Sequence, residues 1–376
     1  MKQSLIGNKS PRYFIKVNIK YLNNTVDKEE RSFLKHNLSI RFAIVALLFA
    51  SILLPLVAAH APLGTGDNES IDKATVIPDP TKSWALYSAL NKDGDPQYYT
   101  FNVTAGQKIH VTMYKSLRDQ DATFTPRLVI IGPGITLQGN ISSKITVPSG
   151  LNAQLVNQTS PTPTFEPFSP GTFTGLADTP LENPTPGKYY LVVFEQSDTP
   201  KGGNYGLAIG DRETYTIDEW VLIPFNLMNI YQWEGQNPVL ILTPMITTLF
   251  IGIILVAWQL KKRCDLANPM AWLGAIAGLT FIGTAATTLG ELIFCATKVS
   301  VGVEAVITLI FVLFPLAFGL VTIRLSIKNS QKAPLRKRIY FVILGVAALF
   351  IWAGLIVGPI LAIITAVMPT SLRKKK

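Results

Sequence analysis

Charged residues are scarce in this chain of 376 residues, where they make up 15% of the sequence while hydrophobic residues make up 48%. The mean hydropathy is positive. This balance disfavours an ordinary soluble enzyme, because soluble domains carry about 25% charged residues. Cysteine is almost absent: Cys264 and Cys295 lie in or beside apolar runs, and the polar middle of the chain has none. A disulfide framework is therefore excluded.

The residues and motifs of common catalytic sites are also missing. His36, His60 and His110 are the only histidines, and they do not form an H-E-x-x-H zinc motif. The sequence has no G-x-S-x-G, Walker or C-x-x-C motif either. These absences disfavour a serine hydrolase, a nucleoside triphosphatase and a dithiol redox protein. An enzyme is therefore the less favoured class.

The net charge of +10 is divided unevenly along the chain. Residues 1–61 carry nine Lys and Arg against three Asp and Glu, and residues 236–376 carry fourteen against three. Residues 62–235 are acidic, with eleven Lys and Arg against eighteen Asp and Glu. Basic residues that border apolar runs are the orientation signal of membrane proteins. We therefore expect a membrane and no nucleic acid as partner.

Four long apolar runs follow residue 235, and the first has no charge from Gly235 to Leu260. About 20 apolar residues in a helix cross the hydrocarbon core of a bilayer. We therefore expect an all-α bundle of four transmembrane helices within residues 239–372. The expected helices are at about 239–260, 268–294, 303–325 and 339–368.

The basic residues also predict an orientation. Residues 261–263 and six Lys and Arg between residues 324 and 338 place the loops after the first and third helices in the cytoplasm. Residues 62–236 are then extracytoplasmic, in a multi-pass protein of the plasma membrane. The basic tail, residues 373–376, conflicts with this scheme because it would end outside. We favour a single tilted last helix; the alternative is a break at Gly358-Pro359 that turns a short segment back.

Small residues are spaced for close helix packing in two places. Gly274 and Gly278 form one pair, and Gly354 and Gly358 form the other. This spacing lets helix backbones approach each other, within the bundle or against a partner protein. No Asp, Glu, Lys, Arg or His lies in the middle of an expected span, so a pump or ion channel acting alone is disfavoured.

Residues 1–61 have the composition of an export signal. A basic stretch is followed by 18 apolar residues, 42–59, and then by small residues. This order is typical of a secretory signal sequence, which would be a signal anchor if it were retained. We favour cleavage after Ala59, which makes His60 the first residue of the mature chain.

Residues 62–213 are expected to form an all-β domain. Apolar residues alternate with polar ones in residues 99–103 and again in 109–113, on either side of an Ala105-Gly106 turn. These two amphipathic strands predict a hairpin. Further short strands at 127–131, 187–194 and 204–210 predict an antiparallel, jelly-roll-like β-sandwich.

Four stretches within residues 80–210 carry a family resemblance. They are "DPQYYTFNVTAGQKIHVTM", "LVIIGPG", "PGKYYLVVFEQ" and "GNYGLAIG". Together they resemble the pre-peptidase C-terminal family of sandwiches in bacterial and archaeal exported proteins. The resemblance implies a non-catalytic domain that binds or presents something, and it names no ligand.

One segment departs from that family pattern, and another links the β domain to the helices. Residues 146–186 are dense in Pro, Ser and Thr, and we expect a long loop over the sandwich. Residues 214–238 are apolar but too interrupted to span a membrane. We expect them to form an interfacial segment that clamps the sandwich to the first transmembrane helix.

The β domain contains two sets of candidate modification or metal sites. Asn91, Asp93 and Asp95 stand at alternate positions, as in calcium loops, although an ordinary turn is the favoured interpretation. Four Asn-x-Ser/Thr sequons would be glycosylated in a host that modifies exported chains. Their asparagines are Asn68, Asn102, Asn140 and Asn157.

Three functions are consistent with these features. The favoured one is a membrane-anchored cell-surface binding or interaction protein that presents the sandwich close to the membrane. An alternative is an accessory subunit that docks on a transporter, enzyme or export complex. A further alternative is copper binding by the amine and imidazole of a mature N-terminal His60 together with His110, since imidazole suits copper.

Overall fold

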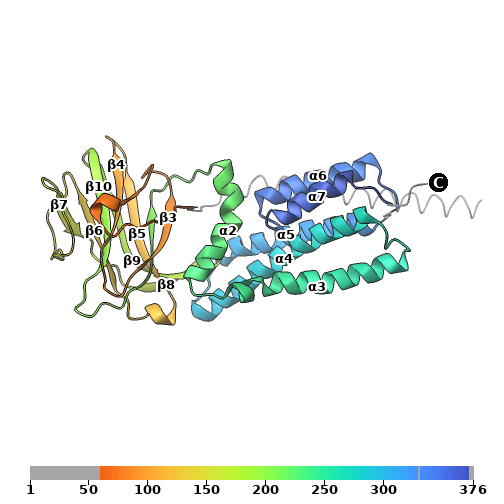
Figure 1. Cartoon of the computed structure of the whole chain (residues 1–376), viewed down its shortest axis with the longest axis horizontal. Helices are drawn as coiled ribbons and strands as arrows, with labels where there is room; N and C mark the ends of the chain where they lie inside the picture. Colours follow the sequence, from red (N-terminus) through yellow and green to blue (C-terminus); the bar gives the residue numbers. More distant parts are fainter. Residues whose placement is uncertain (1–59, 329–330, 372–376) are drawn as a thin grey trace, which may run out of the picture. The chain divides into compact units, whose positions relative to one another are not determined.

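The computed structural model describes residues 60–328 and 331–371. Most of the expected signal sequence and all of the basic tail, residues 373–376, lie outside this part. A β region of two sheets, residues 61–209, precedes six helices in the described chain (Figure 1). The predicted order of an all-β part followed by an all-α part is therefore confirmed.

The β region contains eleven strands in two sheets. Sheet A has the order β1 (Ala61–Pro62), β3 (Trp84–Leu90), β11 (Gly203–Ile209), β5 (Ile109–Ser116), β9 (Gly171–Leu181) and β8 (Thr162–Glu166). Sheet B has the order β2 (Thr75–Val76), β4 (Gln97–Val103), β10 (Gly187–Glu195), β6 (Pro126–Gly132) and β7 (Asn152–Leu155). Two short 3-10 helices, Ile71–Lys73 and Asp119–Asp121, lie in the connections. All strand pairs are antiparallel except β1 with β3 and β2 with β4.

The inner faces of the two sheets form a single apolar core. Phe101 and Leu191 point into it from sheet B, and Val111 and Leu207 point into it from sheet A. The alternation of the strands accounts for this, because every second side chain lies on the same face. Each fully buried large apolar side chain contributes about 1.5–3 kcal/mol. The alternating pattern of the sequence therefore specifies which face is covered.

The expected hairpin of residues 99–113 is wrong. Strand β4 pairs with β2 and β10 in sheet B, whereas β5 pairs with β9 and β11 in sheet A. The apolar faces of β4 and β5 both meet in the core, which they enter from opposite sheets. The turn at Gly106 therefore connects the two sheets, and alternation by itself does not tell such a connection from a hairpin.

The expected loop at residues 146–186 is also wrong. Strands β7, β8 and β9 lie in this segment, and β9 pairs with β5 along its whole length. A register shift between Met113 and Tyr114 accommodates the irregular pairing. Leu176 and Ala177 of β9 reach the core. Backbone pairing to a neighbouring strand thus outweighs the high content of Pro, Ser and Thr.

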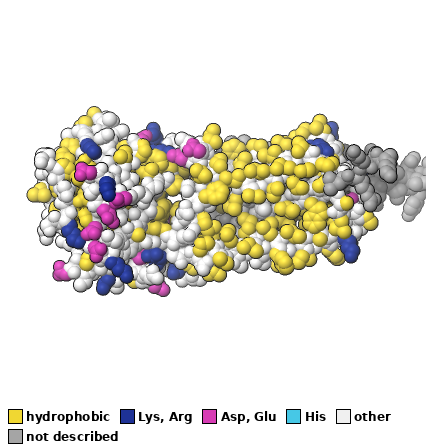
Figure 2. Space-filling view, in the orientation of Figure 1, with side chains coloured by type: hydrophobic (Ala, Val, Ile, Leu, Met, Phe, Trp, Pro, Cys, Tyr) yellow, Lys and Arg dark blue, Asp and Glu magenta, His cyan; other side chains and the backbone are white. Residues whose placement is uncertain are grey.

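Six helices follow the sheets in the described chain. They are α2 (Ile217–Trp233), α3 (Pro238–Lys262), α4 (Pro269–Lys298), α5 (Ala305–Ile327), α6 (Leu335–Phe350) and α7 (Val357–Val367). By length and composition, α3, α4 and α5 can cross a membrane. Figure 2 shows hydrophobic side chains over the surface of the helical part, where many large apolar residues are exposed. These features identify a multi-pass membrane protein.

The expected single helix over 339–368 is wrong, because α6 ends at Phe350 and α7 begins at Val357. Trp352, Gly354 and Leu355 have positive φ angles of 50°, 72° and 58° in the turn between them. Helices α6 and α7 lie side by side (Figure 1). The Arg338 guanidinium donates to the carbonyl of Ala366, which places the start of α6 beside the end of α7. The chain therefore turns back, but ahead of Gly358-Pro359.

The glycine pairs lie at contacts between helices of this chain. A Cβ on Gly278 would come within 2.8 Å of the Gly319 carbonyl oxygen in α5. A Cβ on Gly354 or on Gly358 would collide with Phe281 of α4. These glycines thus allow α4 to pack closely against α5 and against the turn before α7.

We expect Gly278→Val to destabilise the helical part by about 1–3 kcal/mol, because the added side chain forces α4 away from α5. The thermal unfolding of the full chain in detergent measures this loss as a lower melting temperature. Gly290→Val in the same helix is the matched control, since its Cβ would meet Pro244 at an ordinary 3.5 Å. Equal melting temperatures for the two variants would show that this contact is not close.

The turn between α6 and α7 also predicts a topology. In a cysteine-free background, we expect Ser371→Cys and Lys332→Cys to react alike with a membrane-impermeant maleimide, and Lys201→Cys to behave oppositely. The reason is that the end of α7 lies beside the start of α6. Labelling of intact cells, with lysed cells as the control, checks this. Labelling of Ser371→Cys together with Lys201→Cys would contradict the turn.

Candidate functional site

Helix α2 lies between the β region and the other helices. It begins with a capping box, in which Glu219 N donates to Thr216 Oγ1 at 3.4 Å and Thr216 N donates to Glu219 Oε2 at 2.8 Å. The Glu219 carboxylate also accepts a hydrogen bond from Lys82 Nζ at 2.6 Å. Lys82 lies just before the start of β3. The segment 214–238, predicted to be a clamp, is thus largely a helix that is ion-paired to sheet A.

The outer face of sheet A carries aromatic side chains that meet the end of α2. The Trp233 ring lies 5.1 Å from the Tyr87 ring and 6.0 Å from the Tyr114 ring, measured between centroids. Trp233 Nε1 donates to the Ser88 carbonyl at 2.9 Å, and Asn204 Nδ2 donates to the Trp233 carbonyl at 2.6 Å. Such edge-to-face pairs add about 0.5–1.5 kcal/mol each. The outer face of sheet A therefore carries an aromatic cluster, which the end of α2 covers.

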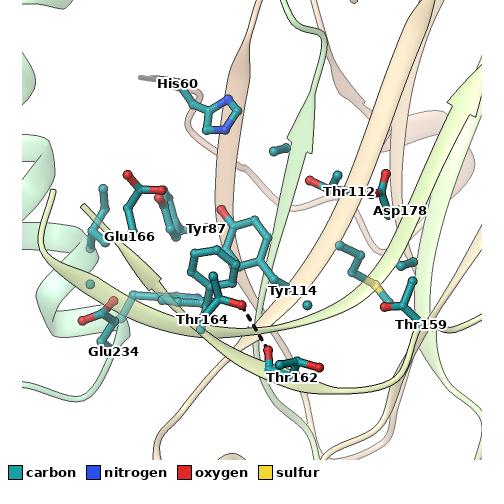
Figure 3. A pocket seen from close by; sticks show the side chains of 18 of the residues that line it. His60, Tyr87, Thr112, Tyr114, Thr159, Thr162, Thr164, Glu166, Asp178 and Glu234 are labelled. Atoms are coloured by element: carbon teal, nitrogen blue, oxygen red, sulfur yellow. Dashed lines mark hydrogen bonds between the residues drawn. The ribbon is translucent and has the colours of Figure 1, made fainter. Parts of the chain in front are cut away.

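A cavity of about 370 Å³ lies between this outer face, strand β8 and the last turns of α2. Figure 3 shows Tyr87 and Tyr114 in its middle, with Glu166 and Glu234 on one side and Thr159 and Asp178 on another. Its other labelled wall residues are hydroxyl-bearing or polar. They are His60, Thr112, Thr162 and Thr164.

A second cavity of about 280 Å³ adjoins the first. The two cavities share His60, Tyr87, Glu166, Ser169 and Ile230. The second is closed by the loop after β8, by α2 and by the first turn of α5. The two volumes together fall in the range of small-molecule sites, which is about 300–1,000 Å³.

Two half-buried carboxylates face the first cavity. Glu234 Oε1 accepts from the Thr172 amide at 2.9 Å, and Gln236 Nε2 donates to Glu234 Oε2 at 3.3 Å. Burial raises the pKa of Glu234 to about 7. Burial, aided by the charge of Glu213, also raises the pKa of Glu166. Neither carboxylate forms an ion pair with an Arg or Lys in the part of the chain that the structure describes, so a cationic or hydrogen-donating ligand would be stabilised here.

The two histidines of the predicted copper site have other partners. His60 Nδ1 lies 2.5 Å from Ser83 Oγ, and desolvation lowers the pKa of this imidazole. His110 Nε2 lies 2.5 Å from Asp178 Oδ1, and its Nδ1 lies 3.0 Å from Asp211 Oδ1. These hydrogen bonds raise the pKa of His110, and the bond to Asp178 has the largest effect. A metal at His110 would have to displace one of the two carboxylates.

The residues of the predicted calcium loop form a capped turn. Asn91 Oδ1 accepts from the amides of Asp93 and Asp95 at 3.1 and 3.3 Å. Lys144 Nζ donates to Asp95 Oδ1 at 3.3 Å and to the Asp93 carbonyl at 2.8 Å. Among the residues that the structure describes, no group of three His, Cys, Asp or Glu side chains is arranged to hold a metal ion. Copper and calcium remain predictions.

The four sequon asparagines differ in accessibility. Asn102, Asn140 and Asn157 are exposed. Asn68 is only 1% exposed, and its Nδ2 donates to the Tyr98 carbonyl at 3.1 Å. The burial of Asn68 leaves no space for a glycan there, whereas the other three asparagines are accessible to one.

The first cavity was not predicted from the sequence. Its two carboxylates come from the segments expected to be a loop and an interfacial linker. One signal was present in the sequence: Tyr114 follows Met113, so one of two adjacent large apolar residues must lie on the outer face of the strand. An aromatic residue on that face indicates that another element covers it.

No family model matches this chain, and no curated protein matches it. Several solved structures match at low similarity, including the following two. The periplasmic inhibitor of g-type lysozyme PliG from Aeromonas hydrophila is 16% identical, with a TM-score of 0.22, over 36% of this chain and 96% of that one. The pre-peptidase C-terminal domain of collagenase from Bacillus anthracis is 18% identical, with a TM-score of 0.20, over 36% and 93%. Both likenesses are distant and cover about a third of this chain.

We expect the raised pKa of Glu234 to make stability depend on pH. The folded protein holds the proton more tightly than the unfolded chain does, so stability falls as pH rises from about 4.5 to about 7. The loss is at most about 3 kcal/mol, and solvent access makes it smaller. Melting temperatures of the full chain between pH 5 and 8 measure it. Glu234→Gln should flatten the profile, whereas the exposed Glu182→Gln should not; identical profiles for the wild type and Glu234→Gln would contradict the assignment.

Proposed function

We propose that this chain is a membrane-anchored binding protein of the cell surface whose ligand site is the pair of cavities between sheet A and α2. The observation that carries the proposal is the first cavity itself. It combines a volume of about 370 Å³, aromatic rings and the carboxylates of Glu166 and Glu234. Sites for small molecules have this composition, with apolar walls and a few convergent polar groups.

The wall chemistry favours a neutral or cationic ligand that carries hydroxyl or ammonium groups. Glu166, Glu234 and the threonine hydroxyls can accept hydrogen bonds from it. The aromatic rings can contact the apolar face of a sugar or a quaternary ammonium group. An anion would be repelled by the carboxylates, so phosphate and sulfate are disfavoured.

Contacts between the β region and the helices support a ligand site held close to the membrane. Thr308 Oγ1 in the first turn of α5 donates to the Pro167 carbonyl at 2.5 Å. Phe165 of β8 packs against Cys295 and Val299 at the end of α4. The basic segments after α3 and α5 lie at the other ends of these helices, where Arg263 Nη1 donates to the Ile327 carbonyl at 3.4 Å. We therefore assign residues 62–236 to the extracytoplasmic side.

A ligand screen with a filled cavity tests the proposal. The detergent-purified full chain is mixed with glucose, choline or inorganic phosphate, and its melting temperature is measured. We expect glucose or choline to raise it and phosphate to leave it unchanged. Thr112→Trp, which places an indole in the cavity, should abolish the increase, while Thr104→Trp in an exposed turn should preserve it. An increase that survives in Thr112→Trp, or no increase with either probe, contradicts the proposal.

The accessory-subunit alternative has a different test. Gly278, Gly354 and Gly358 are used in contacts within this chain, so they do not favour docking on a partner helix. Native mass analysis after gentle detergent extraction measures whether a second membrane protein accompanies the chain. A stoichiometric partner would favour this alternative, and a lone chain would count against it.

A further inference from the structure

A third cavity of about 300 Å³ lies against an adjacent face of α2. Its wall comes from α2, α3, α4, α5 and the turn between α6 and α7. It includes Phe225, Met228, Met245, Thr287, Phe311 and Trp352. Helix α2 therefore has cavities on two faces: Ile223, Asn226 and Ile230 line the polar side, while Pro224, Met228 and Tyr231 line this one.

The wall of this third cavity is apolar except for three threonines of α4. Thr284 Oγ1 accepts from the Gly354 amide at 2.8 Å. The hydroxyl of Thr287 is buried and has no hydrogen-bond partner among the described residues. Buried hydroxyls without partners are rare in folded proteins, because each costs about 1–3 kcal/mol. An occupant that carries an ester or hydroxyl oxygen would satisfy it.

The polar and apolar cavities are neighbours. Phe168 and Leu227 line both the second cavity and the third. The Phe168 ring packs edge-on against Phe311 at 5.2 Å and against Trp352 at 5.6 Å, measured between centroids. Phe168 and Leu227 thus separate the two cavities, and an extended ligand with its polar end at Glu166 and its apolar end at Trp352 would displace the Phe168 ring.

The third cavity also lies beside the lipid-facing surface. Phe225, which lines it, is 52% exposed, and Leu222 one turn earlier is 48% exposed. Large apolar side chains with this exposure, next to membrane-spanning helices, are stable where lipid tails cover them. A molecule dissolved in the bilayer can therefore reach the cavity past Phe225, without crossing water.

We propose that this chain binds a single membrane lipid with a neutral, hydroxyl-rich headgroup, one acyl chain of which fills the third cavity while the headgroup occupies the first two. The inference rests on the proposed function and specifies its ligand as a glycolipid. Charge selects the headgroup, because Glu166 and Glu213 in the second cavity would repel a phosphate group. The apolar wall of the third cavity selects the acyl chain of the lipid.

Lipid retention in nanodiscs tests the inference. The full chain is reconstituted in phosphatidylcholine discs that contain diglucosyl-diacylglycerol or, separately, phosphatidylglycerol. It is then released for native mass analysis. We expect one retained diglucosyl-diacylglycerol per chain and no retained phosphatidylglycerol. Equal retention of the two lipids overturns the headgroup assignment, and retention of neither overturns the lipid site.

Two variants locate the acyl chain. Leu242→Trp fills the third cavity from α3, and Thr287→Ile fills it from α4 and removes the hydroxyl. Each should reduce retention by at least about tenfold, which corresponds to about 1.4 kcal/mol of binding free energy. Leu240→Trp on the lipid-facing side of α3, where Leu240 is 71% exposed, is the matched control and should retain the lipid. Undiminished retention in both cavity variants overturns the inference.

The response to soluble glucose or choline separates this inference from the function on which it rests. If the wild type responds to either soluble probe and Thr112→Trp does not, the polar site stands. Absence of lipid retention in the same preparation then overturns only the lipid inference. If the wild type neither responds to a soluble probe nor retains the lipid, the proposed function and the lipid inference are both overturned.

Discussion

The packing of Trp233 against Tyr87 and Tyr114 is the contact on which the arrangement around α2 depends. A sheet with aromatic residues on its outer face must have that face covered, since large exposed apolar patches are unstable in water. The indole N–H bond to the Ser88 carbonyl fixes the orientation of the ring. Helix α2 is thereby held against sheet A at its C-terminal end, and the first two cavities lie between the sheet and the middle and last turns of α2.

The polar contacts of α2 orient it more than they stabilise it. The ion pair between Lys82 and Glu219 is largely buried, and the cost of removing such charges from water offsets most of their attraction. It holds the first turn of α2 near β3, while Trp233 holds the last turn. Between them, Pro224 occupies the helix interior. Proline has no backbone N–H, so α2 lacks one internal hydrogen bond at this point. The helix is thus held at both ends, and different cavities lie against two of its faces.

The sequence was sufficient for features that depend on local pattern, and insufficient for those that depend on distant contacts. The alternation around Phe101 and Val111 predicted strands, and long apolar runs predicted α3, α4 and α5. The pairing partners of β4 and β5 depend on which sheet each strand joins, which alternation does not encode. The turn around Trp352 combines the positive φ of Gly354 with a hydrogen bond from the Gly354 amide to Thr284 of α4, and the second of these depends on a distant contact. Glu166 and Glu234 are 68 residues apart in sequence, so only the folded chain brings them to one cavity.

The first strand would set the order of events if the chain were exported and cut after Ala59, as the sequence predicts. The Ala61 amide donates to the Ser83 carbonyl at 2.8 Å, and Ala61 is buried at the edge of sheet A. A peptidase that cuts between Ala59 and His60 must hold the chain on both sides of the bond in extended and accessible form. Once β1 has paired with β3, the residues after the bond are no longer free to enter its active site. Processing at this position would therefore have to precede completion of sheet A, so that the β region would finish folding only after the cut.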